Sequence, residues 1–311
     1  MSRARHEPTR ANAMSTPRLY KYLDVQGAKL TLGNRNFKHA KPSDFNDLEE
    51  LTVRSIFPED EETAIREMES GFTDVIMGHL DDPPTCLNAN LRAKVALLQT
   101  IFKANPGAAR LIKEAKAKGQ TPEVFDPKQM RARNAAFVDE MNQHMQGFRI
   151  LCVSECNDSE EMWHRYAEGH KGIVLRITPN VAKDSKYQLF APVTYRESRP
   201  ALYDSVLDFQ EGSLFDDQQE RIRQIMQKII YTKTLPWSYE KEYRLSIPVK
   251  EGNDWNAMPY HPEEISELYL GAKQPDALKA EIVTLAQAVN PAMSIFDVVL
   301  DGAGRVAFRA G

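Results

Sequence analysis

The chain has 311 residues, of which 40 are basic and 44 acidic, so that its net charge is −4. This length provides a large core in one or two domains, and the balanced charge excludes a general electrostatic attraction to nucleic acid. The sequence contains no apolar run that could cross a membrane and no secretory signal pattern. Its three cysteines form no disulfide framework, and the close pair Cys152 and Cys156 lacks the second pair of a zinc site. We therefore expect a cytoplasmic protein without membrane contact.

The N-terminal residues differ from the rest of the chain. Residues 1–17 combine Ser, Arg, Pro and Thr with few apolar side chains, which predicts a disordered lead-in. Residues 18–311 are predicted to form a single domain. Within it, short apolar runs typical of β-strands occur at residues 28–32, 148–153, 172–177, 191–195 and 243–249.

Residues 59–146 differ from their flanks because their apolar side chains recur at helical spacing. Prolines at positions 83, 84 and 106 divide this segment into separate helices. The apolar stripes consist of Ile65, Met68, Phe72, Val75 and Ile76, then Leu91, Val95, Leu98 and Phe102, then Phe137, Met141 and Met145. The spacing predicts a helical insertion between the early strands. Its basic clusters, at residues 110–118 and 128–133, indicate a solvated helix face or a local nucleic-acid surface.

Two further helices and a hairpin are predicted in the C-terminal part. The helices cover residues 216–232 and 276–289. Residues 294–300 and 305–309 form a closing hairpin around Asp301 and Gly302. Together these elements predict an α+β fold, with a mixed, largely antiparallel sheet, flanking helices and the helical insertion.

Residues 237–245 carry the most informative pattern. In a β-strand, Glu240 and Glu242 would project from the same face, because side chains alternate. Neighbouring carboxylates repel one another unless a cation, a proton or a substrate lies between them. Arg244 would either pair with Glu242 and keep both glutamates ionised, or clamp a phosphate group. The alternative is an exposed edge strand whose charges prevent aggregation.

Residues 148–177 are predicted to form a strand, a helix and a second strand. The first apolar run ends at Ser154, and Ser159 with its neighbours provides caps for a helix that begins near residue 160. Trp163 and Tyr166 lie on one face of this helix. Core packing is the ordinary role of such aromatic side chains, and stacking on a ligand is the alternative.

These segments carry a family resemblance. The pattern Met162-Trp163-x-x-Tyr166-Ala167 with His170-Lys171-Gly172, preceded by Cys152-Val153-Ser154, resembles the bacterial family called domain of unknown function 2971. Four other segments resemble the family in the same order: Leu19-Tyr20-Lys21-Tyr22, Pro42-Ser43-Asp44-Phe45-Asn46-Asp47-x-Glu49, Tyr239-Glu240-Lys241-Glu242-Tyr243-Arg244 and Tyr269-Leu270-Gly271. The resemblance covers about residues 18–271 and implies that Asn46 or Asp47 orders a loop across a pocket. The chain departs from the family where Lys38 and His39 follow Phe37 in place of a small hydroxyl residue.

A weaker resemblance is to ADP-ribosyltransferases, in which a first strand, a serine-bearing strand and a late Glu-x-Glu segment surround the nicotinamide of NAD. Here Lys21-Tyr22, Ser154 and Glu240-x-Glu242 occur in that order. The resemblance implies that Glu242 faces the oxocarbenium-like centre, and that Glu240 accepts the proton of the acceptor group. It implies NAD as cofactor, bound by Tyr22, Lys21, Ser154, Asn46, Asp47, Trp163, Tyr166 and Arg244. The acceptor would belong to a protein or a nucleic acid, and bacterial families of this kind often act as toxins or phage-defence effectors.

Two other classes of function fit the same residues. A metal-dependent hydrolase or nuclease would use Asp47, Glu240 and Glu242, although the sequence contains no compact cluster with recognisable metal-ligand spacing. In a non-catalytic binding or regulatory module, the glutamates would be purely structural.

Overall fold

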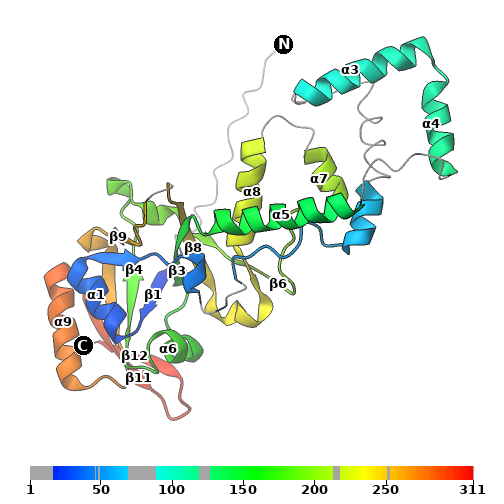
Figure 1. Cartoon of the computed structure of the whole chain (residues 1–311). Helices are drawn as coiled ribbons and strands as arrows, with labels where there is room; N and C mark the ends of the chain where they lie inside the picture. Colours follow the sequence, from blue (N-terminus) through cyan, green and yellow to red (C-terminus); the bar gives the residue numbers. More distant parts are fainter. Residues whose placement is uncertain are drawn as a thin grey trace, which may run out of the picture.

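The computed structural model describes residues 17–45, 47, 50–68, 89–118, 127–212, 218–250 and 253–310. Eight strands form its central sheet (Figure 1), in the spatial order β12 (Val306–Ala310), β11 (Ser294–Leu300), β10 (Ile265–Leu270), β4 (Ile173–Ile177), β1 (Leu19–Leu23), β3 (Phe148–Ser154), β8 (Glu242–Pro248) and β5 (Ala191–Pro192). All neighbouring strands are antiparallel except β10 and β11, which are parallel. This mixed, largely antiparallel sheet with its flanking helices confirms the predicted α+β class.

Two smaller sheets border the central one. In the first, β2 (Asn36–Lys38) pairs antiparallel with β9 (Ala257–Pro259). In the second, β6 (Thr194–Arg196) pairs parallel with β7 (Thr232–Thr234). Both adjoin the functional site described below, because β2 and β7 each contribute residues to it.

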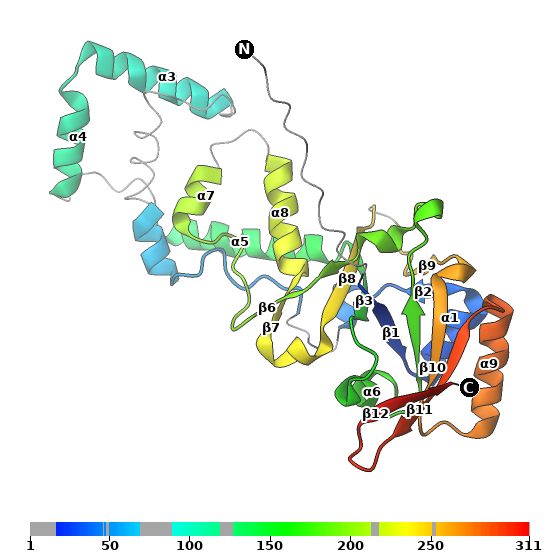
Figure 2. The ribbon, with the colours of Figure 1, turned by 180° about the vertical axis from the view of Figure 1, so that it is seen from behind.

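Helices α1 (Val25–Asn34) and α9 (Asp276–Val289) lie side by side on one face of the sheet (Figure 2). Their buried side chains join those of β3 and β4 in one apolar cluster. The prediction for residues 276–289 is confirmed by α9, whereas the strand predicted at residues 28–32 is wrong. The Asp24 side chain accepts a hydrogen bond from Gly27 N and starts a helix there, in which Ala28 and Leu32 bury one face.

The opposite face of the sheet is covered in two places. Helix α6 (Glu160–Tyr166) packs its Trp163 and Met162 against β1 and β4. A second cluster joins the start of β3 to α5 (Pro127–Met145) and α8 (Gln218–Ile230), with α7 (Val206–Gly212) at its edge. The polar site described below lies between these two apolar clusters.

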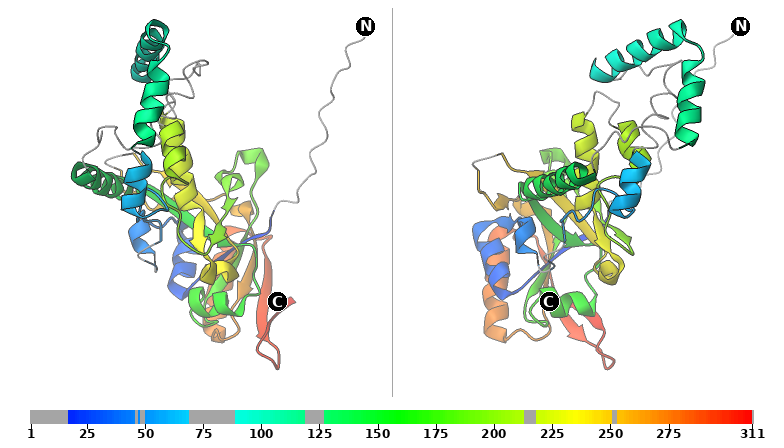
Figure 3. Two further views of the ribbon diagram at one scale, coloured as in Figure 1. Left: turned by 90° about the vertical axis from the view of Figure 1, so that its right-hand side faces the viewer. Right: turned by 45° about the vertical axis from the view of Figure 1, so that its right-hand side comes forward.

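The described part of residues 59–146 is helical and contains no strand. It comprises a helix at residues 61–68, then α3 (Ala89–Ala104), α4 (Ala108–Ala117) and α5. Met141 and Met145 of α5 are buried as their stripe predicts, while α3 and α4 stand away from the central sheet (Figure 1 and Figure 3). Phe72, Val75 and Ile76, and the lead-in up to residue 16, lie outside the described residues.

None of the helices in the described ranges is both long enough and apolar enough to span a membrane.

Candidate functional site

The central sheet opens between β1 and β3. These strands share a single registered pair, Tyr20 with Ser154, whereas β1 forms five such pairs with β4 and β3 forms seven with β8. Farther along β3, Ile150 exchanges two backbone hydrogen bonds with Ala40, at 2.8 and 2.9 Å. The stretch of β3 between these two contacts therefore faces an opening in the sheet.

A cleft of about 720 Å³ occupies this opening. Glu242 reaches it from the sheet face that carries α6, because Tyr20, Ser154 and Glu242 are direct cross-strand neighbours. The opposite wall consists of residues of α1 and β2. Lys21 crosses the opening, since its Nζ donates to the carbonyl of Cys152 at 3.0 Å. Burial lowers the pKa of this amine.

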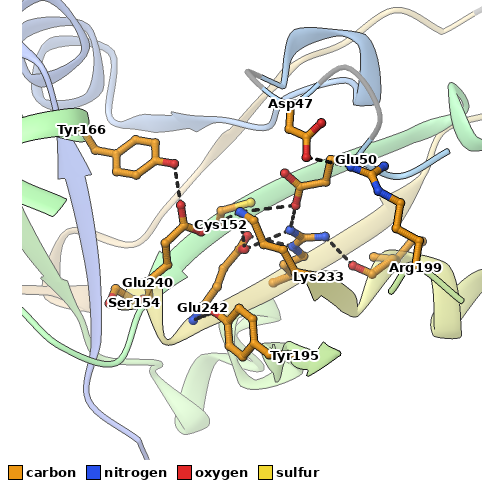
Figure 4. A network of polar contacts seen from close by, with 12 residues as sticks. Asp47, Glu50, Cys152, Ser154, Tyr166, Tyr195, Arg199, Lys233, Glu240 and Glu242 are labelled. Carbon is orange, nitrogen blue, oxygen red and sulfur yellow. Dashed lines mark hydrogen bonds and ion pairs between the residues drawn. The ribbon is translucent and has the colours of Figure 1, made fainter. Parts of the chain in front are cut away.

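The paired glutamates meet at the ammonium group of Lys233, a residue of β7 (Figure 4). Lys233 Nζ donates to Glu240 Oε2 at 2.6 Å and to Glu242 Oε2 at 3.2 Å, and it lies 3.4 Å from Glu50 Oε1. All four side chains are buried. Three carboxylates thus share one ammonium group, which is the kind of cation that closely spaced carboxylates require.

The prediction that Glu240 and Glu242 project from the same face of one β-strand is wrong for Glu240, which does not belong to the strand. Glu240 ends the 3₁₀-helix η4 (Leu235–Glu240), and Lys241 adopts a left-handed conformation with φ of 44°. Glu242 then begins β8. Pro236 favours the helical start of this segment because its ring fixes φ. The turn at Lys241, rather than the alternation of a strand, brings the carboxylates together.

Arg244 forms the internal pair that its spacing from Glu242 predicts. Its Nε and Nη2 donate to the two oxygens of Glu242 at 2.7 and 2.9 Å, and its Nη1 donates to the carbonyl of Ile230 at 2.6 Å. Nη2 also pairs with Glu50. The side chain is fully buried and does not line the cleft, so the alternative role as a phosphate clamp is not supported.

The two glutamates titrate in opposite directions. Burial alone would raise the pKa of Glu242, but Arg244 and Lys233 outweigh this effect and lower the pKa to about 2. Burial raises the pKa of Glu240, and the ammonium of Lys233 does not fully offset it. Glu242 is therefore the more persistent anion, and Glu240 is the better proton acceptor.

Three hydroxyl groups fix the segment that carries these glutamates. Tyr166 Oη donates to Glu240 Oε1 at 2.6 Å, and burial together with the charge of Glu240 raises the pKa of Tyr166. Ser154 Oγ donates to the backbone carbonyl of Glu240 at 2.6 Å. Tyr195 Oη accepts from the backbone nitrogen of Glu242 at 2.8 Å. Ser154 therefore acts on the backbone of the Glu-x-Glu turn, and Tyr166 acts on its first carboxylate.

The aromatic residues predicted to bind NAD take different places. Tyr22 lines the cleft, and its hydroxyl donates to the carbonyl of Cys156 at 3.0 Å. Trp163 does not line the cleft, which corrects its predicted role. Its indole nitrogen donates to the carbonyl of Asn157 at 2.7 Å, and its fully buried ring stacks on His170. Trp163 faces the sheet and Tyr166 faces the cleft, although both belong to α6.

Residues 42–49, the signature loop of the family resemblance, are only partly described. Asp47 borders the cleft, and its Oδ2 forms an ion pair with Arg199 at 2.7 Å (Figure 4). Asn46 lies outside the described residues. The loop therefore borders the cleft at Asp47, and its contact with Arg199 links it to the segment that follows β6.

Sequence reasoning missed Lys233 and Glu50. Lys233 follows the amphipathic helix α8 as a single charge in a short strand, and Glu50 directly follows the signature loop. Neither position carries a pattern that distinguishes it from a solvated side chain. Glu50 meets partners that lie far away in the sequence, Lys233 and Arg244. Lys233 lies only seven and nine residues before Glu240 and Glu242, but these contacts depend on the turn between β7 and β8, which residue spacing does not encode.

Comparison with known families matches residues 162–245 to the model described as Protein of unknown function (DUF2971). The predicted resemblance is thereby confirmed over this segment, which runs from α6 into β8 and includes Tyr166, Lys233, Glu240, Glu242 and Arg244. No curated protein and no solved structure matches the chain. The family description assigns no reaction, so any functional assignment must come from the chemistry of the cleft.

Proposed function

We propose that the chain binds NAD in this cleft and transfers ADP-ribose to a group on a protein or nucleic acid. One observation carries the proposal. Tyr22 and Lys21 from β1, Ser154 from β3 and Glu242 from β8 border one cleft at the opening of the sheet. These residues come from three neighbouring strands in the same order as the motifs that suggest an ADP-ribosyltransferase.

The proposed reaction begins with cleavage of the bond between nicotinamide and C1′ of its ribose. Neutral nicotinamide leaves with the bonding electron pair, and positive charge develops at C1′ and the ring oxygen. The carboxylate of Glu242 faces this charge and stabilises the transition state more than the ground state. The nucleophile of the acceptor then bonds to C1′, and its proton passes to Glu240.

The opposite pKa shifts of the two glutamates support this division of roles. A carboxylate whose pKa is lowered to about 2 stays anionic at neutral pH, as an electrostatic stabiliser must. A carboxylate with a raised pKa takes up a proton more readily, as a general base must. Tyr166 and Lys233 hold the two oxygens of Glu240 at fixed positions.

The metal-dependent alternative has less support. The carboxylates of Glu50, Glu240 and Glu242 are directed at the Lys233 ammonium, and Glu50 and Glu242 also contact the Arg244 guanidinium. A divalent ion would have to displace Lys233 and would meet its repulsion. Within the described ranges, no group of three or more His, Cys, Asp or Glu side chains is arranged to hold a metal ion.

The proposal is tested by thermal unfolding with NAD and by assay of nicotinamide release. A ligand that binds only the folded state raises the melting temperature, so saturating NAD should stabilise the wild-type chain. Stabilisation by Mg²⁺ or Mn²⁺ without any effect of NAD would favour the hydrolase instead.

The two glutamates should be separable in a transfer assay. Glu240→Gln should impair transfer to an acceptor more than it impairs hydrolysis of NAD, because its proposed partner is the incoming nucleophile. The matched control is Glu140→Gln, which changes an exposed glutamate of α5. Equal losses of both reactions in Glu240→Gln would contradict its role as the base.

A further inference from the structure

We infer that Lys233 is a positioning residue for the proposed transfer, because its ammonium group determines the pH range in which Glu240 can accept a proton. This inference rests on the proposed function and deepens it, since it concerns the regulation of the same site. Four charged side chains of one buried network line the cleft (Figure 4): Lys233, Glu50, Glu240 and Glu242. Lys233 acts there through Glu240 and not on the reacting atoms.

The three carboxylates of this network receive unequal support from cations. Glu242 pairs with Arg244 at 2.7 Å and with Lys233 at 3.2 Å, and Glu50 also pairs with both cations. Within the described ranges, Lys233 is the only cation at ion-pair distance from Glu240, with its Nζ 2.6 Å from Oε2. When all five groups are ionised, three buried negative charges face two positive ones. The excess negative charge therefore destabilises Glu240 most, because it has the fewest cations.

The charge of Lys233 is well shielded from water. Its side chain is 7 % exposed, and its Nζ lies 4.9 Å from the ring centroid of Trp237 in a cation–π contact. Burial alone would lower the pKa of this amine, but the three carboxylates outweigh burial and raise the pKa. Lys233 therefore remains a cation throughout the range in which carboxylates titrate, and its effect on Glu240 persists over that range.

Within the described residues, the other charged and titratable groups that face Glu240 or Lys233 belong to several elements. They are Lys21 of β1, Tyr166 of α6, Tyr195 of β6, Tyr239 of η4, Glu242 and Arg244 of β8, and Glu50. Burial raises the pKa of the three tyrosines, so they stay neutral at neutral pH. Burial lowers the pKa of Lys21, and this amine is unchanged in the variants compared below. Differences between those variants therefore report how Lys233 is shared.

Glu50 competes with Glu240 for this ammonium group. Its Oε1 lies 3.4 Å from Lys233 Nζ, compared with 2.6 Å for Oε2 of Glu240. Residue 50 directly follows the signature loop, in which Asp47 borders the cleft. A displacement of Glu50 would leave the ammonium group to Glu240 and Glu242, and so would lower the proton affinity of Glu240. The signature loop is thereby linked to the strength of the proposed base.

The test measures the protonation of Glu240 and the reaction separately. NMR of protein labelled in its glutamate carboxyl groups gives the pH midpoint of Glu240, whose signal is assigned by its loss in Glu240→Gln. The pH profile of transfer is measured with NAD radiolabelled in its adenylate half, as incorporation of label into the protein and nucleic acid of a bacterial lysate. The variants are Lys233→Met, Glu50→Gln and the control Lys228→Met. Lys228 pairs with Asp204 at 3.1 Å and does not line the cleft.

The midpoint of Glu240 should move in opposite directions in the two network variants. In Lys233→Met it should rise by about one pH unit, because Glu240 loses the ammonium group that pairs with it. In Glu50→Gln it should fall, and in Lys228→Met it should equal that of the wild type. Glu50→Gln decides the question if Lys233→Met does not fold, because it alters the sharing of the ammonium group without removing it.

The pH profile of transfer should follow the midpoint of Glu240 in each variant. Nicotinamide release should keep its profile in Lys233→Met, because Glu242 retains its pair with Arg244 and stays anionic. A merely structural role of Lys233 would lower both reactions without moving either profile. An unchanged midpoint in Glu50→Gln and in any folded Lys233→Met would overturn the role of Lys233 and leave the proposed function standing. Absence of nicotinamide release by the wild type at every pH would overturn the proposed function, and the role of Lys233 in transfer with it.

Discussion

The two edges of β3 differ in how far their backbone groups pair with a neighbouring strand. Along β8, seven registered pairs form a continuous ladder, and the charges beside it are buried and paired. Along β1, one registered pair is followed by an opening, where the Lys21 side chain replaces a backbone partner. The closed edge holds Glu242 and Arg244 in fixed positions, and the open edge leaves room for a ligand. Rigidity and access are therefore supplied by opposite sides of a single strand.

The largest expected effect is a loss of stability when the ion pairs beside the closed edge, where β3 pairs with β8, are broken. Arg244→Met leaves the buried carboxylates of Glu242 and Glu50 without their guanidinium, so the free energy of unfolding should fall by about 3–5 kcal/mol. Urea unfolding measures this change. Arg223→Met is the control, because Arg223 pairs with Glu220 on the exposed side of α8 and its loss should have little effect. Similar stability of the two variants would show that the closed edge does not depend on its buried ion pairs.

The second largest expected effect is on the rate of nicotinamide release. Glu242→Gln keeps the size of the side chain and one oxygen for Arg244 but removes the charge proposed to face C1′. Nicotinamide release should fall by about two to three orders of magnitude, the loss typical of one preorganised electrostatic group. If the protein is a toxin or a phage-defence effector, its expression in a bacterial host should slow growth, and Glu242→Gln should relieve this. Undiminished release by a folded Glu242→Gln would end the proposed mechanism.

The closed edge should also be sensitive to acid. The pKa of Glu242 is lowered from 4.5 to about 2 in the folded protein, so its stabilising contribution is complete above pH 4.5 and is lost as the pH falls toward 2. Glu242→Gln no longer titrates. Urea unfolding at several pH values should therefore show a shallower loss of stability in this variant than in the wild type. Parallel pH profiles would contradict the ionic pairing of Glu242.

The smallest expected effect is on ligand affinity at the open edge, where β3 faces β1. Lys21→Met removes the amine that bridges the opening and, in the proposed complex, the charge beside the diphosphate. Affinity for NAD should fall by about tenfold, because a hydrogen bond to a charged group contributes about 1.5–3 kcal/mol. Lys29→Met on α1 is the control, since Lys29 pairs with Glu281 and does not line the cleft. If Lys21→Met and Lys29→Met weakened NAD binding equally, the net charge of the protein, and not the position of Lys21, would determine the affinity.

The fold was predictable where a local signal was sufficient. The cap at Ser159 and the apolar run at residues 173–177 gave α6 and β4, because helix caps and buried strands leave short-range patterns. The run at residues 28–32 was misassigned, since a five-residue window does not separate a strand from a buried helix face. Local sequence thus predicts whether a segment is a helix or a strand more reliably than it predicts where that segment lies in the sheet.

The candidate site was predictable in part. Glu240, Glu242 and Arg244 were identified from one segment, and the pairing of Arg244 with Glu242 was predicted as well. The position of Glu240 was not predicted, because the left-handed Lys241 breaks the alternation. Glu50 was missed because its partners lie far away in the sequence, and Lys233 was missed because it meets Glu240 and Glu242 through a turn that residue spacing does not encode. Trp163 and Tyr166 show the same limit, because helical spacing places both residues on one side of α6 without telling which of them meets the cleft.

The opening of the sheet has a consequence for the exchange of backbone hydrogens with solvent. In an antiparallel strand, the N–H and C=O groups of a residue point to the same side, and successive residues alternate. The Cys152 carbonyl faces the opening, where it accepts Lys21, so the Cys152 amide faces the opening as well, while those of Leu151 and Val153 face β8. Deuterium should therefore enter at Cys152 far sooner than at its two neighbours, and a bound ligand should close this difference. One amide in the middle of a buried strand thus reports whether the cleft is filled.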